Sequence, residues 1–278
     1  MTGHIAGKSI VITGAGGGFG GLVARKAAAL GAQVTCGDIN LAAAQAVVAE
    51  IVAAGGKAQA VEVDVTSLPA VKALVARALE AFGAVDVMVN NAGIMPLAFI
   101  ADHEAAYPAW ERCIDINIKG VLNGMVAAHD PMIAAGRGQM VNISSIYGNF
   151  PVIGAAVYGA SKAAVNFLSE SLRVESRGKI KVTTIKPTGV PATGLSGTIV
   201  NMGAAVGILA HNTADFMEMS EQMAAGTFPV EKLDPEAMDY ASLAPEHIAD
   251  AVIHAIDQPL GVSISEVTVR AAGDHFVL

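Results

Sequence analysis

Tyr158 and Lys162 stand four residues apart and form a pair that could carry out acid–base chemistry. On a helix, residues i and i+4 lie on one face, so the Lys162 ammonium can approach the Tyr158 hydroxyl. A free tyrosine has a pKa of about 10 and is a poor base at neutral pH. A nearby positive charge lowers that pKa, which gives a group that can exchange a proton with an alcohol or a carbonyl. Solvated surface pairs show the same spacing, so the prediction depends on the residues upstream.

A glycine-rich loop follows the first apolar segment of the chain. Ser9–Thr13 is a short β-branched run that predicts a buried strand, and Leu22–Leu30 predicts a helix. Glycines between a strand and a helix let the backbone turn tightly and approach a pyrophosphate, while the helix N-terminus supplies N–H donors. We therefore expect a nucleotide-binding loop rather than a flexible turn, with contacts from Gly14, Gly17, Gly18, Phe19 and Gly20.

An acidic residue follows the second predicted strand, Gln33–Cys36. Asp38 lies 18 residues after Gly20, about where a carboxylate meets the ribose 2′-hydroxyl of a dinucleotide. A carboxylate there would repel a 2′-phosphate, and the neighbouring Ile39 and Asn40 offer no cation. The predicted cofactor is therefore NAD rather than NADP, with Asp38 and Ile39 as contacts. The alternative is that Asp38 is an ordinary helix N-cap.

Strands and helices alternate along the rest of the chain. The predicted helices are Leu41–Ala54, Ala70–Phe82, Glu104–Cys113, Ile114–Ala135 and Ala156–Arg177, and the further strands are Ala58–Val65, Val85–Val89, Gln139–Ile143, Lys179–Ile185 and Ser263–Arg270. This alternation predicts an α/β fold, a Rossmann-type doubly wound sheet of about seven mostly parallel strands with helices on both faces. No repeat, low-complexity tract or linker interrupts the pattern, so we expect one domain over residues 1–278.

The composition excludes several classes of protein. Lys and Arg total 17 against 25 Asp and Glu, giving a net charge of −8 without any basic run, which argues against nucleic-acid and membrane-surface binding. Cys36 and Cys113 make no disulfide framework, and the N-terminal residues do not resemble a signal peptide. We therefore expect a cytoplasmic protein with reduced thiols.

A long apolar segment, residues 189–245, follows the sixth predicted strand and is expected to form a lid over a substrate pocket. Residues 187–214 contain no Asp, Glu, Lys or Arg, but prolines and asparagines interrupt them, so we expect no membrane span. The lid holds five of the 11 methionines, Met202, Met217, Met219, Met223 and Met238. Flexible methionines suit an adaptable apolar pocket, although they could equally pack lid helices together. No Arg or Lys lies between Lys186 and Lys232, which argues against an anionic substrate handle in this segment.

Taken together, these residues resemble the short-chain dehydrogenase/reductase family from about Gly7 to Gly189, and more loosely to the end. The motifs that carry the resemblance are Thr13-Gly14-x-x-x-Gly18-x-Gly20, Asp64-Val65, Asn90-Asn91-Ala92-Gly93, Asn117, Ser145 and Tyr158-x-x-x-Lys162. Ser145 precedes Tyr158 by 13 residues, a spacing similar to that of the family's serine–tyrosine pair. Each motif alone is modest evidence, but their order and spacing together are highly specific for this family.

The resemblance implies a role for each matching residue. Tyr158 would be the general acid/base, Lys162 would lower its pKa and hold the nicotinamide ribose, Ser145 would bind the substrate oxygen, and Asn117 would hold a water that links Lys162 to solvent. Further cofactor contacts are implied for Asp64, Val65, Asn91, Ala92, Gly93, Pro187, Gly189 and Val190, together with Tyr158 and Lys162. This chemistry needs no metal, and the histidines show no convincing ligand spacing.

Four positions near the site leave alternatives open. Ser144 could compete with Ser145, but strand alternation points adjacent side chains to opposite faces. Tyr147 has no cation four residues on, and is either a substrate contact or a packed ring. Thr188 replaces the glycine that usually follows Pro187 in the family, and Thr193 is displaced by one position, so the nicotinamide contacts of this loop are the least defined. The predicted substrate contacts are Ser145, Tyr147, Met95, Phe150 and Tyr158.

The predicted function is that of an NAD-dependent oxidoreductase that interconverts a secondary alcohol and a ketone. Its substrate would be a small apolar molecule, either aromatic, alicyclic or steroid-like. The alternatives are an NADPH-dependent carbonyl reductase and a non-catalytic dinucleotide sensor on the same fold. The resemblance also implies a homotetramer or homodimer packed through Ile114–Ala135 and Ala156–Arg177.

Overall fold

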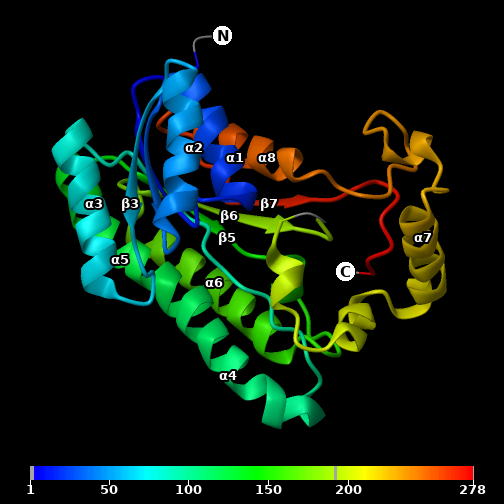
Figure 1. Cartoon of the computed structure of the whole chain (residues 1–278). Coiled ribbons are helices and arrows are strands. Elements are labelled where there is room, and N and C mark those ends of the chain that lie inside the picture. The colour runs from blue at the N-terminus through cyan, green and yellow to red at the C-terminus, as the bar shows by residue number, and fades with distance from the viewer. Residues whose placement is uncertain (1–2, 191–192, 278) are drawn as a thin grey trace.

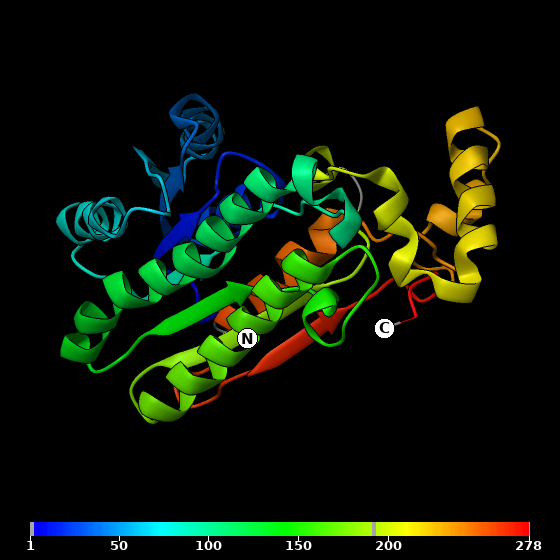
Figure 2. The ribbon, with the colours of Figure 1, turned by 90° about the horizontal axis from the view of Figure 1, so that it is seen from below.

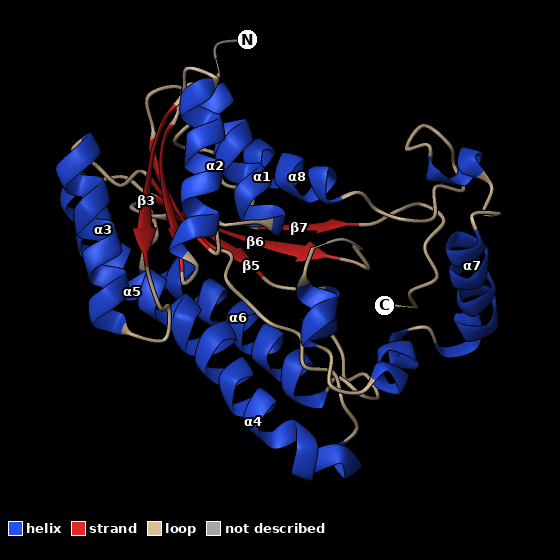
Figure 3. Ribbon diagram, in the orientation of Figure 1, coloured by secondary structure: helices blue, strands red, loops and turns tan. Residues whose placement is uncertain are grey.

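Seven short segments rich in Val, Ile and Thr lie side by side in one parallel sheet, in the order β3-β2-β1-β4-β5-β6-β7 (Figure 3). The computed structural model describes residues 3–190 and 193–277. The strands are β1 Ser9–Thr13, β2 Gln33–Asp38, β3 Lys57–Glu62, β4 Val87–Asn90, β5 Gln139–Ile143, β6 Lys181–Pro187 and β7 Glu266–Val269. All six neighbouring pairs are parallel, so the predicted doubly wound fold class is confirmed.

Helices cover both faces of the sheet. Figure 1 shows α1, α2 and α8 on one face and α3, α5 and α6 on the other, with α4 continuing into α5 through the short π-helical segment η2. Their bounds are α1 Gly18–Ala29, α2 Leu41–Ala53, α3 Leu68–Phe82, α4 His103–Cys113, η2 Ile114–Lys119, α5 Gly120–Ala135, α6 Ala156–Glu175, α7 Thr213–Ala225 and α8 Pro245–Ile256. None of the helices within the described ranges is long and apolar enough to cross a membrane.

The central strand β1 shows why the sheet is covered on both sides. Ile10 and Ile12 pack into the hydrophobic cluster under α1, α2 and α8, whereas Val11 packs into the cluster under α3, α5 and α6. Successive side chains of a strand point to opposite faces, so a continuous apolar run is stable only where both faces are buried. All three side chains are fully inaccessible to solvent.

Several element boundaries differ from those predicted. α1 begins at Gly18 rather than Leu22, because the first helical hydrogen bond already forms within the glycine segment, from the Gly21 amide to the Gly17 carbonyl at 2.9 Å. β3 ends at Glu62, three residues before the predicted end, because Asp64 starts a turn in which its carboxylate accepts hydrogen bonds from the Thr66 amide and hydroxyl. Turns of this kind compete locally with strand pairing.

The carboxyl ends of the strands form the edge on which the predicted motifs meet. β1 lies between β2 and β4, and the chain leaves β1 toward α1 on one face and leaves β4 toward α4 on the other. Open α/β sheets bind ligands in the crevice at such a switch point. Figures 1 and 2 show the segment that contains α7 standing beyond this edge, beside the C-terminal segment.

Candidate active site

The glycine loop after β1 forms a cradle that has no room for side chains at Gly14, Gly16 and Gly20. A Cβ atom on Gly20 would lie 2.3 Å from the Gly14 carbonyl oxygen, and Gly14 has a φ of +66°, a conformation that favours glycine. The N-cap of α1 is Gly17, which provides no side-chain cap, and the first turn of α1 contains no acidic residue. The N–H groups at this helix end are therefore available to an anion, which fits the pyrophosphate of a dinucleotide.

A small polar network joins this cradle to the end of β4. The Thr13 hydroxyl accepts hydrogen bonds from the Asn91 amide at 3.1 Å and the Ala92 amide at 3.3 Å. The Asn91 side-chain amide donates in turn to the carbonyl oxygens of Thr13 at 2.9 Å and Gly14 at 3.0 Å. Asn91 thus fixes the glycine loop against the neighbouring strand, at the switch point of the sheet.

Asp38 faces the cradle from the end of β2. Its carboxylate accepts a hydrogen bond from the Gly16 amide at 2.8 Å and another from the Asn40 amide at 2.9 Å. The N-cap of α2 is Asn40, whose side chain accepts from the Ala43 amide, so the alternative that Asp38 caps this helix does not hold. Ile39 lies beside Asp38 and is 70% exposed. A carboxylate held against the glycine loop is the arrangement that accepts a ribose hydroxyl.

The four residues that the sequence nominated for catalysis are all buried near the carboxyl ends of β4 and β5. Their exposed fractions are 0% for Asn117, 5% for Ser145, 3% for Tyr158 and 5% for Lys162. Ser145, Tyr158 and Lys162 line one cavity of about 400 Å³. The Lys162 ammonium donates to the Ile143 carbonyl oxygen at 2.9 Å and lies 5.8 Å from the centroid of the Tyr158 ring.

Burial shifts the protonation of both partners in this pair. It raises the pKa of Tyr158 above its ordinary value, while a hydrogen bond with Ser145 acts in the opposite direction. Burial also lowers the pKa of Lys162 to about 8. The sequence predicted a lowered pKa for Tyr158; the shift has the other sign because both groups are removed from water and the ammonium is directed at the Ile143 carbonyl. In this state the phenol carries its proton.

Asn117 holds the segment after β4 in place. It lies in η2, and its side chain donates to the Ile94 carbonyl at 2.9 Å and to the Ser161 hydroxyl at 3.0 Å, while it accepts from the Ile94 amide at 2.9 Å. The Ser161 hydroxyl donates to the Tyr158 carbonyl at 2.7 Å. These bonds couple the segment after β4 to the first turn of α6, and the role of Asn117 in holding a water stays a prediction.

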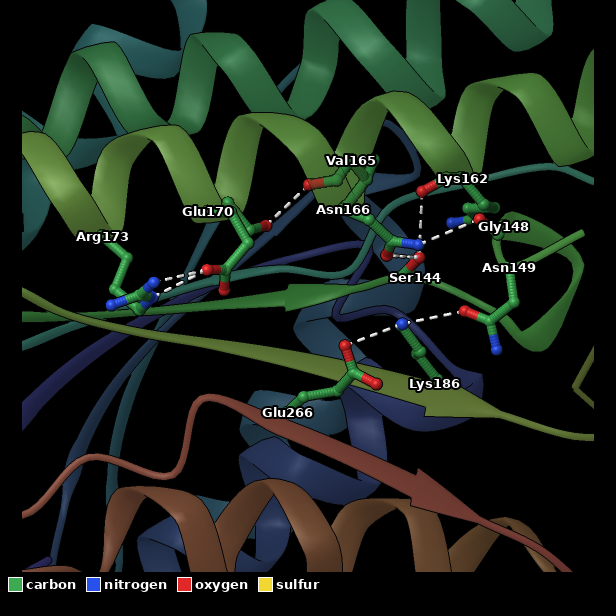
Figure 4. A network of polar contacts seen from close by, with 11 residues as sticks. Ser144, Gly148, Asn149, Lys162, Val165, Asn166, Glu170, Arg173, Lys186 and Glu266 are labelled. Carbon is green, nitrogen blue, oxygen red and sulfur yellow. Dashed lines mark hydrogen bonds and ion pairs between the residues drawn. The ribbon is translucent and has the colours of Figure 1, made fainter.

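Strand alternation separates the two serines at the end of β5. The Ser144 hydroxyl is turned toward α6, where it bonds to Asn166 Oδ1 at 2.6 Å and to the Lys162 carbonyl at 3.1 Å (Figure 4). Ser145 forms the hydrogen bond with Tyr158 described above. The Tyr147 ring packs edge to face on the Tyr158 ring, with centroids 5.4 Å apart, and burial raises its pKa to about 12. Tyr147 therefore stays protonated and contributes a neutral wall.

The cavity gathers residues predicted for both cofactor and substrate. Its lining includes the predicted cofactor contacts Phe19, Asn91, Gly93, Pro187, Gly189 and Val190, and the predicted substrate contacts Met95, Tyr147, Ser145 and Tyr158. Phe150 is not among the lining residues and is 62% exposed, so the structure does not bring it to the site. Among the lid methionines, Met219 and Met223 line the cavity, whereas Met202, Met217 and Met238 are exposed.

Sequence reasoning missed the part of the cavity wall that the C-terminal segment provides. His275 and Phe276 line the cavity, together with Phe216 of α7. A Cβ atom on Gly189 would lie 1.9 Å from the Phe276 ring, and the Thr188 hydroxyl lies 3.3 Å from Asp274 Oδ2. Thr188, which departs from the family pattern, therefore fastens the loop after β6 to this segment. The threonine at position 188 was visible in the sequence as a departure from the family pattern, but the sequence did not indicate that its partner is Asp274.

A buried lysine braces the loop that follows Ser145. Lys186 of β6 is 6% exposed, and its ammonium donates to Asn149 Oδ1 at 2.8 Å and pairs with Glu266 of β7 at 2.7 Å (Figure 4). Asn149 ends the short helical turn Ile146–Gly148. The sheet is thereby tied to the backbone that carries Ser145.

Because of this ion pair, substitutions at Glu266 and at Lys186 should lower the free energy of unfolding by different amounts. Glu266→Gln leaves a buried ammonium without its counter-ion, and we expect it to lower the free energy of unfolding by about 1–3 kcal/mol. Lys186→Met removes the buried charge itself and leaves a half-exposed carboxylate that water can solvate, so we expect a loss of less than about 1 kcal/mol. Urea unfolding of both variants tests this, and a larger loss for Lys186→Met would contradict it.

Comparisons with known proteins agree with the geometry. A family model described as short chain dehydrogenase matches residues 8–204. The chain is 39% identical over 193 residues to a 2,5-dichloro-2,5-cyclohexadiene-1,4-diol dehydrogenase of Sphingobium indicum, a match that covers 68% of this chain and 76% of that protein. It is 39% identical over 188 residues to a 3-alpha-(or 20-beta)-hydroxysteroid dehydrogenase of Mycobacterium tuberculosis, covering 67% of this chain and 70% of that protein.

A solved structure shares the fold over almost the whole chain. It is a metagenomic short-chain oxidoreductase in complex with NADP, 31% identical, with a TM-score of 0.71 and coverage of 95% of this chain and 97% of that one.

Among the described residues, no group of three or more His, Cys, Asp or Glu side chains is arranged to hold a metal ion.

Proposed function

The chain belongs to the short-chain dehydrogenase family, and from this premise we propose that it is an NAD-dependent oxidoreductase interconverting a secondary alcohol and a ketone on a small apolar molecule. The observation that carries the proposal is the single cavity in which Ser145, Tyr158 and Lys162 meet apolar walls that include Leu97 and Met219. The two relatives act, by their names, on a cyclic diol and on hydroxysteroids, which supports an alicyclic alcohol as substrate.

In this proposal, side chains of the protein transfer the proton of the reaction. When bound in the glycine cradle, NAD supplies the hydride acceptor. Tyr158 exchanges a proton with the substrate oxygen, and Ser145 donates a hydrogen bond to that oxygen as negative charge develops on it. Lys162, whose ammonium lies 5.8 Å from the centroid of the Tyr158 ring, reduces the cost of the phenolate when the proton leaves, although burial keeps the resting phenol protonated. Because burial favours the protonated phenol, oxidation of the alcohol should speed up as the pH rises and reduction of the ketone as it falls.

The preference for NAD rests on Asp38. Its carboxylate lies at the glycine loop, 2.8 Å from the Gly16 amide, where a 2′-phosphate would bring a second negative charge. No salt bridge between Asp38 and a cation occurs in residues 3–190 and 193–277. We propose NAD on this ground, although the solved relative is a complex with NADP.

The charge of the Asp38 side chain can be removed by a substitution that keeps the shape of the side chain. Asp38→Asn keeps a carbonyl oxygen for the Gly16 amide, and we expect it to raise the ratio of NADP to NAD turnover (kcat/KM) by about tenfold or more, equivalent to about 1.4 kcal/mol. The ratio is measured with both cofactors on one alcohol, and Asn40→Ala, which alters the adjacent cap, is the control. A wild-type preference for NADP would overturn the assignment.

The direct test of the proposed function is turnover on a panel of secondary alcohols, followed by the absorbance of reduced nicotinamide. Oxidation of alicyclic members with NAD supports the proposal, while activity confined to sugars or acyl phosphates contradicts its substrate class. NADPH-dependent reduction alone would favour the carbonyl-reductase alternative. Tight NAD binding without turnover on any member would favour the non-catalytic sensor.

Three further features belong to the same proposal. We propose that residues 189–245 act as the substrate lid within one domain, since Phe216, Met219 and Met223 of this segment line the cavity. We propose a homodimer or homotetramer packed through α5 and α6, whose outer faces expose Leu122 and Phe167. We also propose a cytoplasmic location, which the free, buried thiols of Cys36 and Cys113 support.

A further inference from the structure

The segment that follows β7 is fastened on both sides of the cavity. The Asn212 side chain, just before α7, donates to the His275 carbonyl at 3.0 Å, and the Val277 amide donates to the Ile208 carbonyl at 3.2 Å. On the other side, Asp274 accepts from the Thr188 hydroxyl in the loop after β6. Figure 1 shows this segment passing between the sheet and α7. The His275 and Phe276 side chains are thereby held in the cavity wall.

The imidazole of His275 has an unused hydrogen-bonding group. Its ring packs edge to face on the Phe216 ring, with centroids 6.1 Å apart. Nδ1 is buried and has no hydrogen-bond partner among the residues that the structure describes. A buried polar atom without a partner is unfavourable, and such atoms are few in folded proteins. Rotation of the ring by 180° about its terminal torsion exchanges Nδ1 with a carbon, so a nitrogen can be presented on either edge.

Two other polar side chains that line the cavity have partners within the protein. The Ser220 hydroxyl donates to the Phe216 carbonyl at 2.9 Å, and the Thr188 hydroxyl is directed at Asp274. The His275 ring contacts the Phe216 ring, and the apolar Met219 and Met223 of α7 line the same cavity. A molecule that fills this side of the cavity therefore meets mainly apolar side chains, and it reaches the unused His275 nitrogen once the ring has turned that edge toward the cavity.

We propose that His275 is a specificity-determining residue that hydrogen-bonds a second oxygen of the substrate. The reacting alcohol lies at Ser145 and Tyr158, an apolar ring fills the cavity between, and a hydroxyl or carbonyl elsewhere on that ring meets the imidazole. The substrate class is then an alicyclic diol or hydroxyketone rather than a simple alcohol. This inference rests on the proposed function, because it requires the reacting oxygen to be placed by Ser145 and Tyr158.

A matched pair of substrates tests the inference. We compare kcat/KM for cyclohexane-1,4-diol and cyclohexanol with NAD, and use the ratio of the two values as the readout. The wild type should favour the diol by about tenfold or more. His275→Phe, which keeps an aromatic ring against Phe216 but has no polar group, should bring the ratio close to one by lowering activity on the diol alone. His275→Asn should restore part of the preference.

The outcomes separate the inference from the proposed function. Turnover of cyclohexanol by the wild type supports the proposed function whatever the ratio. A ratio near one in the wild type, or an equal loss on both substrates in His275→Phe, overturns the role of His275. If the wild type oxidises neither compound, the proposed function fails for this class, and calorimetric binding of the diol decides the inference. Equal affinity of the wild type and His275→Phe for the diol would overturn it.

Discussion

Replacing Tyr158 by Phe is expected to lower turnover by about 10³-fold while leaving the affinity for NAD unchanged. The substitution removes only the hydroxyl, the one group of this ring that can exchange a proton with the substrate oxygen. The ring itself, 3% exposed and packed on Tyr147, keeps its place. Turnover is followed by the absorbance of reduced nicotinamide, and NAD affinity by calorimetry.

The neighbouring phenol provides the matched control for this experiment. Tyr147→Phe removes a hydroxyl from a ring whose centroid lies 5.4 Å from that of Tyr158 in the same cavity, but the residue four positions after Tyr147 is Pro151 rather than a lysine. We expect Tyr147→Phe to keep kcat within about tenfold of the wild type, below the range for loss of a general acid–base group. Unchanged turnover in Tyr158→Phe would refute the catalytic assignment, and equal losses in the two variants would indicate a general disturbance of the cavity.

Replacing Lys162 by Met is expected to abolish most activity and yet stabilise the protein without cofactor at pH 7. The ammonium is 5% exposed, and its pKa falls from 10.5 to about 8, so the charged form is disfavoured by on the order of 3 kcal/mol. Methionine has nearly the same length and carries no charge. Part of the gain is lost, because the Ile143 carbonyl also loses its donor.

The dependence on pH has a definite sign. The folded-state pKa of Lys162 lies below that of the unfolded chain, so the unfolded chain binds more protons between pH 8 and 10.5 and the free energy of unfolding rises with pH in that window. The advantage of Lys162→Met should therefore be greatest below pH 8 and shrink toward pH 10.5.

Urea unfolding of wild type and Lys162→Met at pH 7 and pH 10 measures this difference directly. Lys179→Met, at an exposed position, is the control and should show no such trend. If the gain in the free energy of unfolding of Lys162→Met stayed constant with pH, burial would not disfavour the charged form of Lys162 in the folded protein. Full activity in Lys162→Met would remove it from the catalytic set.

Local spacing was enough to predict most of the fold and the centre of the site. The apolar run of β1, the glycines after it and the four-residue interval from Tyr158 to Lys162 each act through neighbours in the chain, so their geometry follows from strand and helix periods. Alternation also implied that only one of Ser144 and Ser145 reaches the site, and the family resemblance, through the spacing to Tyr158, pointed to Ser145. Asp38 could be placed at the glycine loop because parallel strands end at a common edge.

The sequence alone thus determined the order of the elements, which depends on short-range periodicity, and the resemblance of its motifs to a known family pointed to the residues at the sheet edge. Only the tertiary structure decided the sign of the Tyr158 pKa shift, because desolvation depends on every group packed around the phenol. It also decided that Phe150 lies at the surface while His275 and Phe276 complete the cavity. Those positions depend on contacts such as Thr188 with Asp274, 86 residues apart, which no local period encodes.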